Sequence, residues 1–335
     1  SRRAFQLEEL LPLMRSYFVI QLVSLPFVCW FNTFRQFTDG ITDTRVAMWI
    51  LIGGNIMNVF GNWVLIYGHL GMEEMGLVGA GLSTMISRIV MAIVMVSIFF
   101  FSKRYKEYRK GWRQGSINRT DFKQVTVLGL PLALQMGMET AAFSLSSLMV
   151  GWFGTTALAA HQVMLTISQL GYMIYYGLAA AVAVRISNFM GQRDYTAVKR
   201  TATAGIHLVF FLAMLTSIPV FIFRHSIGGL FTDSSEVVSM VSMTIIPFMI
   251  YQFGDGMQCN YANAMRGIAV VKPLIWIAFV AFFIVSLPLG YLFGVVMNYQ
   301  LIGIWYAFPF GLTTAGLLYY VYYQKGLKRI EESAK

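Results

Sequence analysis

The sequence predicts an all-α integral membrane protein with nine transmembrane helices. Hydrophobic residues make up 57% of the 335 residues and charged residues only 12%, about half of the charged share found in soluble domains. Apolar windows of about 20 residues, the length that crosses a bilayer as a helix, recur along the whole chain. Lipid offers no partners for backbone polar groups, so each window must satisfy them internally as a helix.

The nine windows follow one another from the first residues to the last. Pro26 interrupts the first window, 17–34, whereas the third and fourth windows are separated by a basic stretch at 103–123. The other eight windows are 46–68, 75–102, 124–152, 157–184, 202–223, 237–265, 273–297 and 300–323. We therefore expect three helices before the basic stretch, six helices after it, and no soluble domain.

The basic residues gather on one side of the membrane when successive helices alternate in direction. Twenty of the 25 Lys and Arg residues then share a side, including the basic stretch and the tail 325–335. Only Arg2, Arg3, Arg15 and Arg224 fall on the other side. The positive-inside rule predicts that the basic side and the C-terminus are cytoplasmic. The net charge of +10 thus reflects topology, and we expect no nucleic-acid partner.

Parts of the chain repeat after a shift of 227 residues. Gly40-Ile41 matches Gly267-Ile268, and the basic residue Arg45 matches Lys272. Further along, Trp49-Ile50 matches Trp276-Ile277, and Gly76 matches Gly303. We interpret the matches as an internal duplication, which is typical of transporters. The first three helices pair with the last three, so the middle three would need partners about 100 residues before residue 1.

Two carboxylates lie inside apolar windows, where acids are rare. Glu139 lies within 124–152, and Asp255 lies within 237–265 between Gly254 and Gly256. A charge near the bilayer centre costs about 2.5–3.5 kcal/mol on insertion scales, so such residues usually face a partner, a cavity or an ion. The flanking glycines let a ligand or another backbone approach Asp255. Both acids are therefore candidates for binding a cation, including Na⁺, although a structural hydrogen bond would also explain them.

Three neutral polar residues are further candidates for the same site. Tyr172 offers an aromatic face, which attracts cations, and Gln135 and Gln162 offer amide oxygens as neutral ligands. Each has a plainer interpretation, since tyrosine and glutamine in such helices often serve packing alone.

Several motifs resemble the multidrug and toxic-compound extrusion (MATE) transporters. The second half of the chain resembles their second lobe at Leu130-Pro131 before Glu139, at Ala160-His161-Gln162-Val163, and at Val184-Arg185-Ile186-Ser187-Asn188 with Gly191. The first half resembles the corner between their fourth and fifth helices at Arg35, Asp39-Gly40 and Thr44-Arg45. Asp255 fits the acidic position on their tenth helix, and the resemblance covers nearly all of the chain.

The resemblance implies a twelve-helix, two-lobe fold with an internal repeat, of which this chain lacks the first three helices. Residues 1–102 would form helices four to six of the N-terminal lobe, 103–123 a cytoplasmic basic linker, 124–324 the C-terminal six-helix lobe, and 325–335 a cytoplasmic tail. Both the repeat and the resemblance therefore predict the same three helices upstream of residue 1.

The resemblance also implies a function. MATE proteins export cationic amphipathic molecules in exchange for Na⁺ or H⁺, without another cofactor. In the NorM-like branch, the coupling-cation region would comprise Glu139, Asp255 and Tyr172, whereas the extra acid of the eukaryotic branch would fall at Thr166. The archaeal branch has its key acids in the first lobe, so a second cation site in the first lobe is an alternative that the sequence does not exclude. We expect a monomer in the bacterial inner membrane, in contact with membrane lipids.

Other functions fit the sequence less well. A lipid-linked oligosaccharide flippase of the same superfamily would bind phosphates with several intramembrane basic residues, and only Arg88 qualifies. An intramembrane aspartyl protease would need two aspartates that share a proton, but the second acid is Glu139. The chain also contains no Gly-x-x-x-x-Gly-Lys motif for nucleotide, and Cys29 and Cys259 have no metal-binding spacing. We therefore expect a transporter that is not an enzyme.

Overall fold

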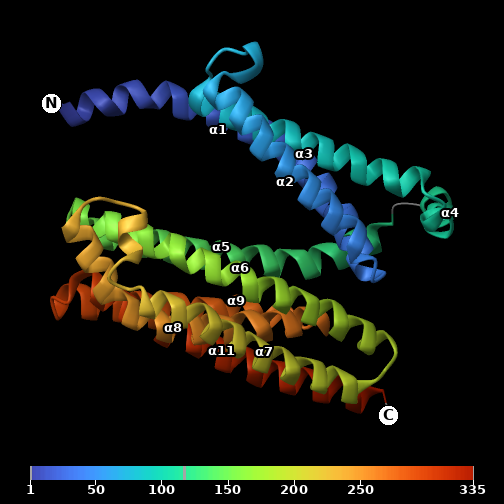
Figure 1. Ribbon diagram of the computed structural model, residues 1–335. Helices are drawn as coiled ribbons and strands as arrows, with labels where there is room; N and C mark the ends of the chain where they lie inside the picture. The colour runs from blue at the N-terminus through green and yellow to red at the C-terminus, as the bar shows by residue number, and fades with distance from the viewer. Residues whose placement is uncertain (1, 116–117, 335) are drawn as a thin grey trace. The chain divides into compact units, whose positions relative to one another are not determined.

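The computed structural model describes residues 2–115 and 118–334, with side chains for 14–112, 114–115 and 118–334. It divides into two compact units, Ser1–Ile117 and Asn118–Lys335, which we describe separately (Figure 1). Within the described ranges, nine helical spans are long and apolar enough to cross a membrane. The all-α membrane fold predicted from the apolar windows is therefore confirmed.

Unit 1 consists of three long helices and a short one. Helix α3 packs along both α1 and α2 (Figure 1), and a 3-10 turn at Lys103–Tyr105 connects α3 to α4. Helix α1 continues past Pro26 without a break. The bounds are α1 (Arg2–Gly40), α2 (Thr44–Tyr67), α3 (Gly76–Phe101) and α4 (Lys106–Gln114). A small core of Phe31, Ala47, Ala92 and Met95 joins the three long helices.

Arg88 is the basic residue that the sequence places inside a span of unit 1. Its guanidinium donates hydrogen bonds of 2.6 Å to the Gln21 side-chain oxygen and of 2.6 Å to the Ser24 hydroxyl oxygen. Neutral oxygens on α1 therefore satisfy this cation of α3. Arg88 therefore joins α1 and α3.

Unit 2 is a bundle built around two interior helices. Its bounds are α5 (Arg119–Gly151), α6 (Thr155–Gly191), α7 (Tyr195–Ile222), α8 (Ser235–Gly267), α9 (Lys272–Ala278), α10 (Leu287–Tyr291) and α11 (Gln300–Ser333). Helices α9 and α10 form a single span, Lys272–Val296, which also contains two π-helical stretches, Phe279–Ser286 and Leu292–Val296.

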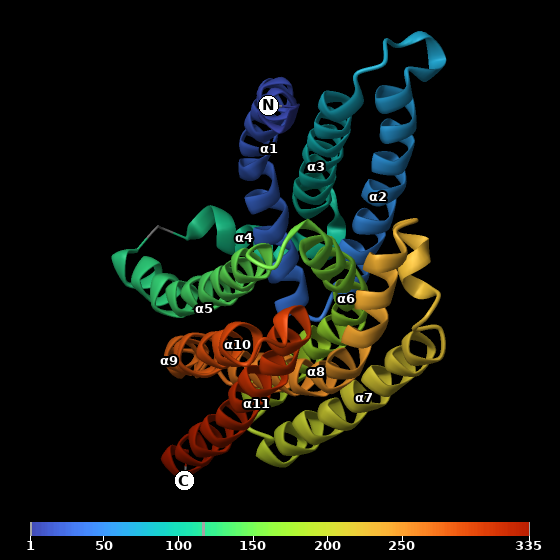
Figure 2. The same cartoon turned by 90° about the vertical axis from the view of Figure 1, so that its left-hand side faces the viewer.

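Helices α8 and α11 pack against each other along their length (Figure 2) and are the most buried spans of unit 2. Half of the apolar window of α8 and 61% of that of α11 are buried, against 17% for α5. Large side chains fill the interior, among them Phe248, Trp305 and Tyr319, all fully buried. Because lipid tails are as apolar as these side chains, close packing rather than the hydrophobic effect holds such helices together. Helix α5 is the least buried span of the bundle.

Two helix corners at positions related by the 227-residue shift have the same backbone turn. At the α1–α2 corner, Thr42 has a positive φ of 63°, and at the α8–α9 corner Ala269, 227 residues later, has a φ of 58°. Three backbone hydrogen bonds also correspond: 41→37, 42→39 and 43→38 in the first corner match 268→264, 269→266 and 270→265 in the second. Two corners with so little sequence in common thus share one turn geometry.

A third corner adopts the same turn. Between α6 and α7, Arg193 has a φ of 59°, and the bonds run 192→188, 193→190 and 194→189. Asp194 then caps α7 by accepting a hydrogen bond from the Ala197 amide at 2.9 Å, as short polar side chains do at helix starts. In unit 2 this corner and the C-terminus lie at the same end, on the right in Figure 1.

Candidate functional site

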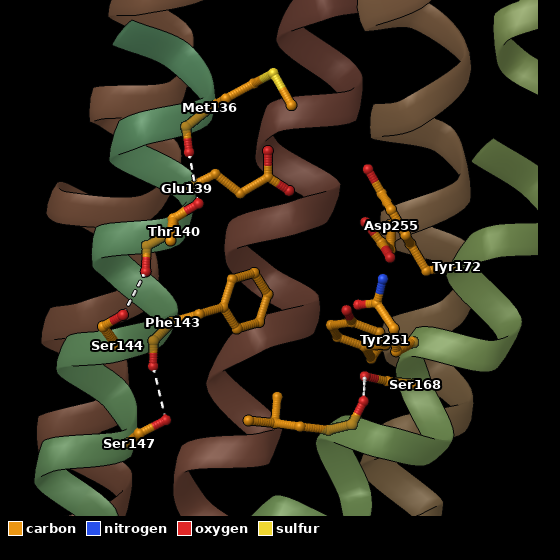
Figure 3. A pocket seen from close by; sticks show the side chains of 12 residues that line it. Met136, Glu139, Thr140, Phe143, Ser144, Ser147, Ser168, Tyr172, Tyr251 and Asp255 are labelled. Carbon is orange, nitrogen blue, oxygen red and sulfur yellow. Dashed lines mark hydrogen bonds between the residues drawn. The ribbon is translucent and has the colours of Figure 1, made fainter. Parts of the chain in front are cut away.

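Unit 2 contains a cavity of about 380 Å³ whose walls are formed by α5, α6 and α8. The α5 wall contributes Met136, Glu139, Thr140, Phe143, Ser144 and Ser147; the opposite wall contributes Leu165, Ser168, Gln169 and Tyr172 from α6 and Tyr251 and Asp255 from α8. Figure 3 shows Glu139 and the Phe143 ring pointing from α5 toward the side that carries Asp255 and Tyr251. The two intramembrane acids thus face one cavity from opposite walls.

Asp255 is almost fully buried, with 2% of its surface exposed. The Tyr175 hydroxyl donates a hydrogen bond of 2.5 Å to one carboxylate oxygen, and the Tyr251 hydroxyl is a second hydrogen-bond partner. Among the described side chains, no basic residue forms an ion pair with this carboxylate. Asp255 is therefore satisfied by hydrogen bonds while its charge is left without a counter-ion.

Glu139 is a half-buried residue on the opposite wall. The Gln258 side-chain amide donates a hydrogen bond of 3.1 Å to its Oε1 atom, and the carboxylate interacts electrostatically with Asp255 and Arg266. Arg266 in turn donates a hydrogen bond of 3.1 Å to the Gln135 side-chain oxygen. Both acids thus belong to one electrostatic site, with a carboxylate on each wall.

The other predicted residues fall in different places. Tyr172 lines the cavity, its ring stacked on Tyr176 at a centroid distance of 5.2 Å. Gln135 is buried just beyond the cavity, where its oxygen is occupied by Arg266. Gln162 has an exposed side chain and is not among the residues that line the cavity. Of the two amides that the sequence suggested, neither forms part of the cavity wall.

Three residues of the site were not singled out from the sequence: Tyr175, Tyr251 and Gln258. Tyr251 and Gln258 lie four residues before and three residues after Asp255, so helical spacing places all three on neighbouring positions of one face. That spacing was a usable signal. Tyr175 reaches Asp255 from another helix, α6, and no local pattern predicts that contact.

The glycines on either side of Asp255 serve helix packing. A Cβ on Gly254 would collide with Thr313 of α11, and a Cβ on Gly256 would collide with Val209 of α7. The expected close approach to α8 is thus made by the neighbouring helices. By contrast, a Cβ on Gly137 of α5, two residues before Glu139, would meet nothing within 4 Å.

A fully buried histidine links the cavity wall to the bundle interior. The Trp305 indole donates a hydrogen bond of 3.1 Å to Nδ1 of His161, and Nε2 of His161 lies 2.9 Å from the Ser147 hydroxyl oxygen. Indole is only a donor, so Nδ1 accepts and the histidine proton resides on Nε2, which donates to Ser147. His161 therefore serves as a neutral link between α5, α6 and α11.

Unit 1 contains a buried acid of a different kind at the start of α2. Asp43 is 6% exposed, accepts a hydrogen bond of 2.6 Å from the Tyr105 hydroxyl, and forms an ion pair of 2.9 Å with Arg104. Burial, and then the hydrogen bond to Asp43, raises the pKa of Tyr105 to about 12, so the phenol stays protonated and remains a donor at neutral pH. Turn chemistry alone explains neither contact; Asp43 anchors the start of the basic stretch to the α1–α2 corner.

Comparison with known proteins agrees with this arrangement of helices. A family model described as MatE matches residues 131–292. The multidrug resistance protein NorM of Aliivibrio fischeri is 32% identical over 314 residues, which cover 92% of this chain and 68% of NorM. The chain belongs to the MATE family. It is therefore a multi-pass membrane protein of a multidrug-transporter family and not an enzyme.

Solved structures show the same MATE fold. The outward-facing conformation of a multidrug resistance MATE transporter of the MOP superfamily matches with a TM-score of 0.86 at 18% identity, covering 95% of this chain and 70% of that one. A MOP superfamily transporter from Pyrococcus furiosus, described as having a binding pocket of reverse polarity that suggests a different function, matches with a TM-score of 0.85 at 17% identity, covering 94% and 70%. Because one fold holds pockets of either polarity, the cavity's own residues must indicate the cargo.

Proposed function

We propose that this protein is a secondary-active multidrug exporter that exchanges Na⁺ or H⁺ for organic cations across the bacterial cytoplasmic membrane. The observation that carries the proposal is the pair of acids, Glu139 and Asp255, on opposite walls of one cavity. Of the residues that line it, these two are the only ones with a formal charge, and both are negative. Such a cavity attracts cations and repels the phosphates of a lipid-linked oligosaccharide.

The aromatic and apolar lining suits the organic part of the cargo. Phe143, Tyr172 and Tyr251 line the cavity together with Met136 and Leu165. Aromatic faces attract cations, and a flexible methionine adapts to ligands of different shape. An acidic cavity with this lining fits amphipathic cations as a class rather than one molecule.

The coupling ion would bind at the same two acids. Na⁺ is a hard cation that takes oxygen ligands, and the carboxylates of Glu139 and Asp255 with the hydroxyls of Tyr172, Tyr251 and Ser168 provide them around the cavity. A proton would bind either carboxylate directly. Within the described residues, no cluster of three or more His, Cys, Asp and Glu side chains forms a denser metal site, so a weakly held, exchangeable ion fits better than a tightly bound metal.

Exchange follows from competition for one negative charge. A ligand shifts a conformational equilibrium only by its differential affinity for the two states. An ion or proton at Glu139 and Asp255 neutralises the charge that holds the cationic cargo and so favours its release on the outside. Cargo arriving from the cytoplasm displaces the ion in turn. The basic helix ends and the C-terminus would face the cytoplasm, with the protein acting as a monomer among membrane lipids.

Counterflow in proteoliposomes tests this function. The protein is reconstituted with a fluorescent cationic dye, and an inward Na⁺ gradient and a pH gradient are imposed separately. Export driven by either gradient supports the proposal and identifies the coupling ion. Dye movement that neither gradient accelerates, or equal movement of an anionic dye, would reject it.

A further inference from the structure

Four serine and threonine hydroxyls line the acidic cavity, and each donates its single proton to a carbonyl of its own helix. Figure 3 shows these bonds running back along α5 and α6. The donors and acceptors are Thr140 to Met136, Ser144 to Thr140 and Ser168 to Leu165, each at 2.9 Å, and Ser147 to Phe143 at 3.0 Å. The protons of these hydroxyl groups are therefore not free to donate a hydrogen bond to a ligand in the cavity.

A hydroxyl has one proton to donate and two lone pairs that accept. With the proton committed to the helix backbone, Thr140 and Ser144 present only acceptor lone pairs to a ligand. Ser147 also accepts the Nε2 proton of His161, which leaves it a single lone pair. The α5 wall is thus a row of hydrogen-bond acceptors, although its residues are nominally both donors and acceptors.

Two of the four donor-bearing residues on the opposite wall are also consumed: Ser168 donates to the Leu165 carbonyl, and Tyr251 directs its hydroxyl proton to Asp255. Outside the lining, Tyr175 donates to Asp255 and the Gln258 amide donates to Glu139. Of the lining residues, Gln169 and Tyr172 carry side-chain N–H or O–H groups for which the described residues provide no acceptor. The cavity as a whole offers many more acceptors than donors.

We propose that the acceptor-rich wall makes the cavity select cations that carry N–H groups, such as primary ammonium, guanidinium and amidinium, over quaternary cations of equal charge. This inference rests on the proposed function, since it presumes that organic cations occupy the cavity. The two carboxylates attract both kinds of cation, but only an N–H group forms hydrogen bonds with the lone pairs of Thr140 and Ser144. On the α5 wall, a ligand that brings acceptors would first have to break the bonds of Thr140 and Ser144 to the helix backbone.

Two probes of matched shape test the selectivity directly. Dansylcadaverine ends in a primary ammonium, and its N,N,N-trimethyl derivative carries the same charge without N–H groups at that end. Fluorescence titration of the purified wild-type protein should give a Kd for dansylcadaverine that is at least about fivefold lower than the Kd for the trimethyl probe. One additional hydrogen bond is worth about that factor. Equal affinities, tighter binding of the trimethyl probe, or binding of neither probe would overturn the inference.

Substitutions then locate the acceptors. Thr140→Val with Ser144→Ala removes two oxygens with little change of shape and should weaken dansylcadaverine about fivefold or more, with the trimethyl probe changed less than about twofold. Ser146→Ala is the matched control, because Ser146 is buried on the same helix, donates to Ala142 at 2.9 Å and does not line the cavity. Equal weakening of both probes by the double variant, or the same effect from the control, would count against the inference.

A final comparison separates this inference from the proposed function. Glu139→Gln with Asp255→Asn should weaken both probes alike, because it removes the charge and leaves the acceptor wall intact. If both probes bind this variant as they bind wild type, the acidic cation site is wrong and the inference that rests on it is rejected as well. If the acid variant weakens both probes but wild type shows no preference between them, the cation site stands and only the N–H selectivity is rejected.

Discussion

Asp43 in unit 1 and Asp255 in unit 2 are both buried, and a tyrosine hydroxyl donates a hydrogen bond to each of them. They differ in what neutralises them. Asp43 has the Arg104 guanidinium 2.9 Å away, whereas the polar partners of Asp255 are the neutral hydroxyls of Tyr175 and Tyr251. A buried acid with its own cation is complete, and one with neutral partners beside a cavity still attracts a cation.

The comparison offers a way to separate structural from functional acids in a membrane protein. Burial and hydrogen bonding do not discriminate, because both aspartates are buried and bonded. The local counter-charge and the presence of a cavity do discriminate. Glu139 falls on the functional side, since its direct partner is the neutral Gln258 amide and its carboxylate faces the cavity.

The largest expected effect comes from removing the charges of unit 2. Asp255→Asn and Glu139→Gln should each reduce gradient-driven export to background while the protein still folds, because the amides keep size and hydrogen bonding but lose the charge. Asp43→Asn should do the reverse, lowering stability by about 1 kcal/mol through the lost charge, with little change in export per folded molecule. Dye efflux normalised to folded protein, together with thermal unfolding in detergent, measures both. If the double variant with Asp255→Asn and Glu139→Gln exported as well as wild type, the proposed difference between structural Asp43 and the functional acids of unit 2 would be wrong.

The tyrosines provide the next test. Tyr105→Phe leaves a buried carboxylate oxygen without its donor and should lower stability by about 1–3 kcal/mol. Tyr175→Phe removes the corresponding donor from Asp255 and should change the ion concentration for half-maximal export, because the carboxylate then depends more on the coupling ion. The check is whether the two variants differ in kind: a stability loss for one, an altered ion dependence for the other. If Tyr175→Phe changed stability alone, Asp255 would resemble Asp43 more closely than proposed.

Arg104 tests the importance of the counter-charge itself. Its side chain is 60% exposed, so solvent screens much of the pairing energy with Asp43. Arg104→Gln should therefore lower stability by about 1 kcal/mol or less, and the loss should shrink as salt is added. Thermal unfolding at low and high salt measures it. Lys110→Gln is a suitable control, because Lys110 pairs with Glu107 on the exposed face of α4.

The smallest effect concerns the repeated corners. Thr42 and Ala269 occupy left-handed conformations that cost a side chain about 1 kcal/mol. Thr42→Gly and Ala269→Gly should each stabilise the protein by less than about 1 kcal/mol, since glycine's greater freedom in the unfolded chain offsets part of the relief. If the two corners are equivalent, unfolding midpoints should rise by similar amounts. If one substitution raised the unfolding midpoint and the other lowered it, the two corners would differ in backbone strain despite their shared geometry.

Much of the fold was predictable because the bilayer limits the possibilities so strongly. The nine apolar windows became nine spans, and Pro26 did not end the first one. Several helices extend beyond their windows, for example α6 to Gly191 and α11 to Ser333. Those polar extensions lie past the apolar limit, where hydrophobicity no longer marks a helix. The π-helical stretches in Lys272–Val296 have no counterpart in the apolar pattern either.

The candidate site was predictable where one helix carried the signal. The cost of burying charge identified Glu139 and Asp255 without any contact information, and both line the cavity. The amides show the limit of this reasoning, since Gln135 and Gln162 are similar in sequence, yet one binds Arg266 and the other is exposed. Tyr175 shows the same limit, because its contact with Asp255 depends on how α6 packs on α8.

The glycines beside the two acids bear on how the protein can evolve. On α8, any residue larger than glycine at 254 or 256 collides with Thr313 or Val209. Substitutions at these two positions beside Asp255 are therefore expected to destabilise the helix packing and to be eliminated. On α5, position 137 beside Glu139 has open space around it. New cargo preferences are therefore expected to arise by mutation on α5, with α8 inherited almost unchanged. A saturation library of both helices, selected on successive dyes, would show whether adaptive mutations gather on the permissive wall.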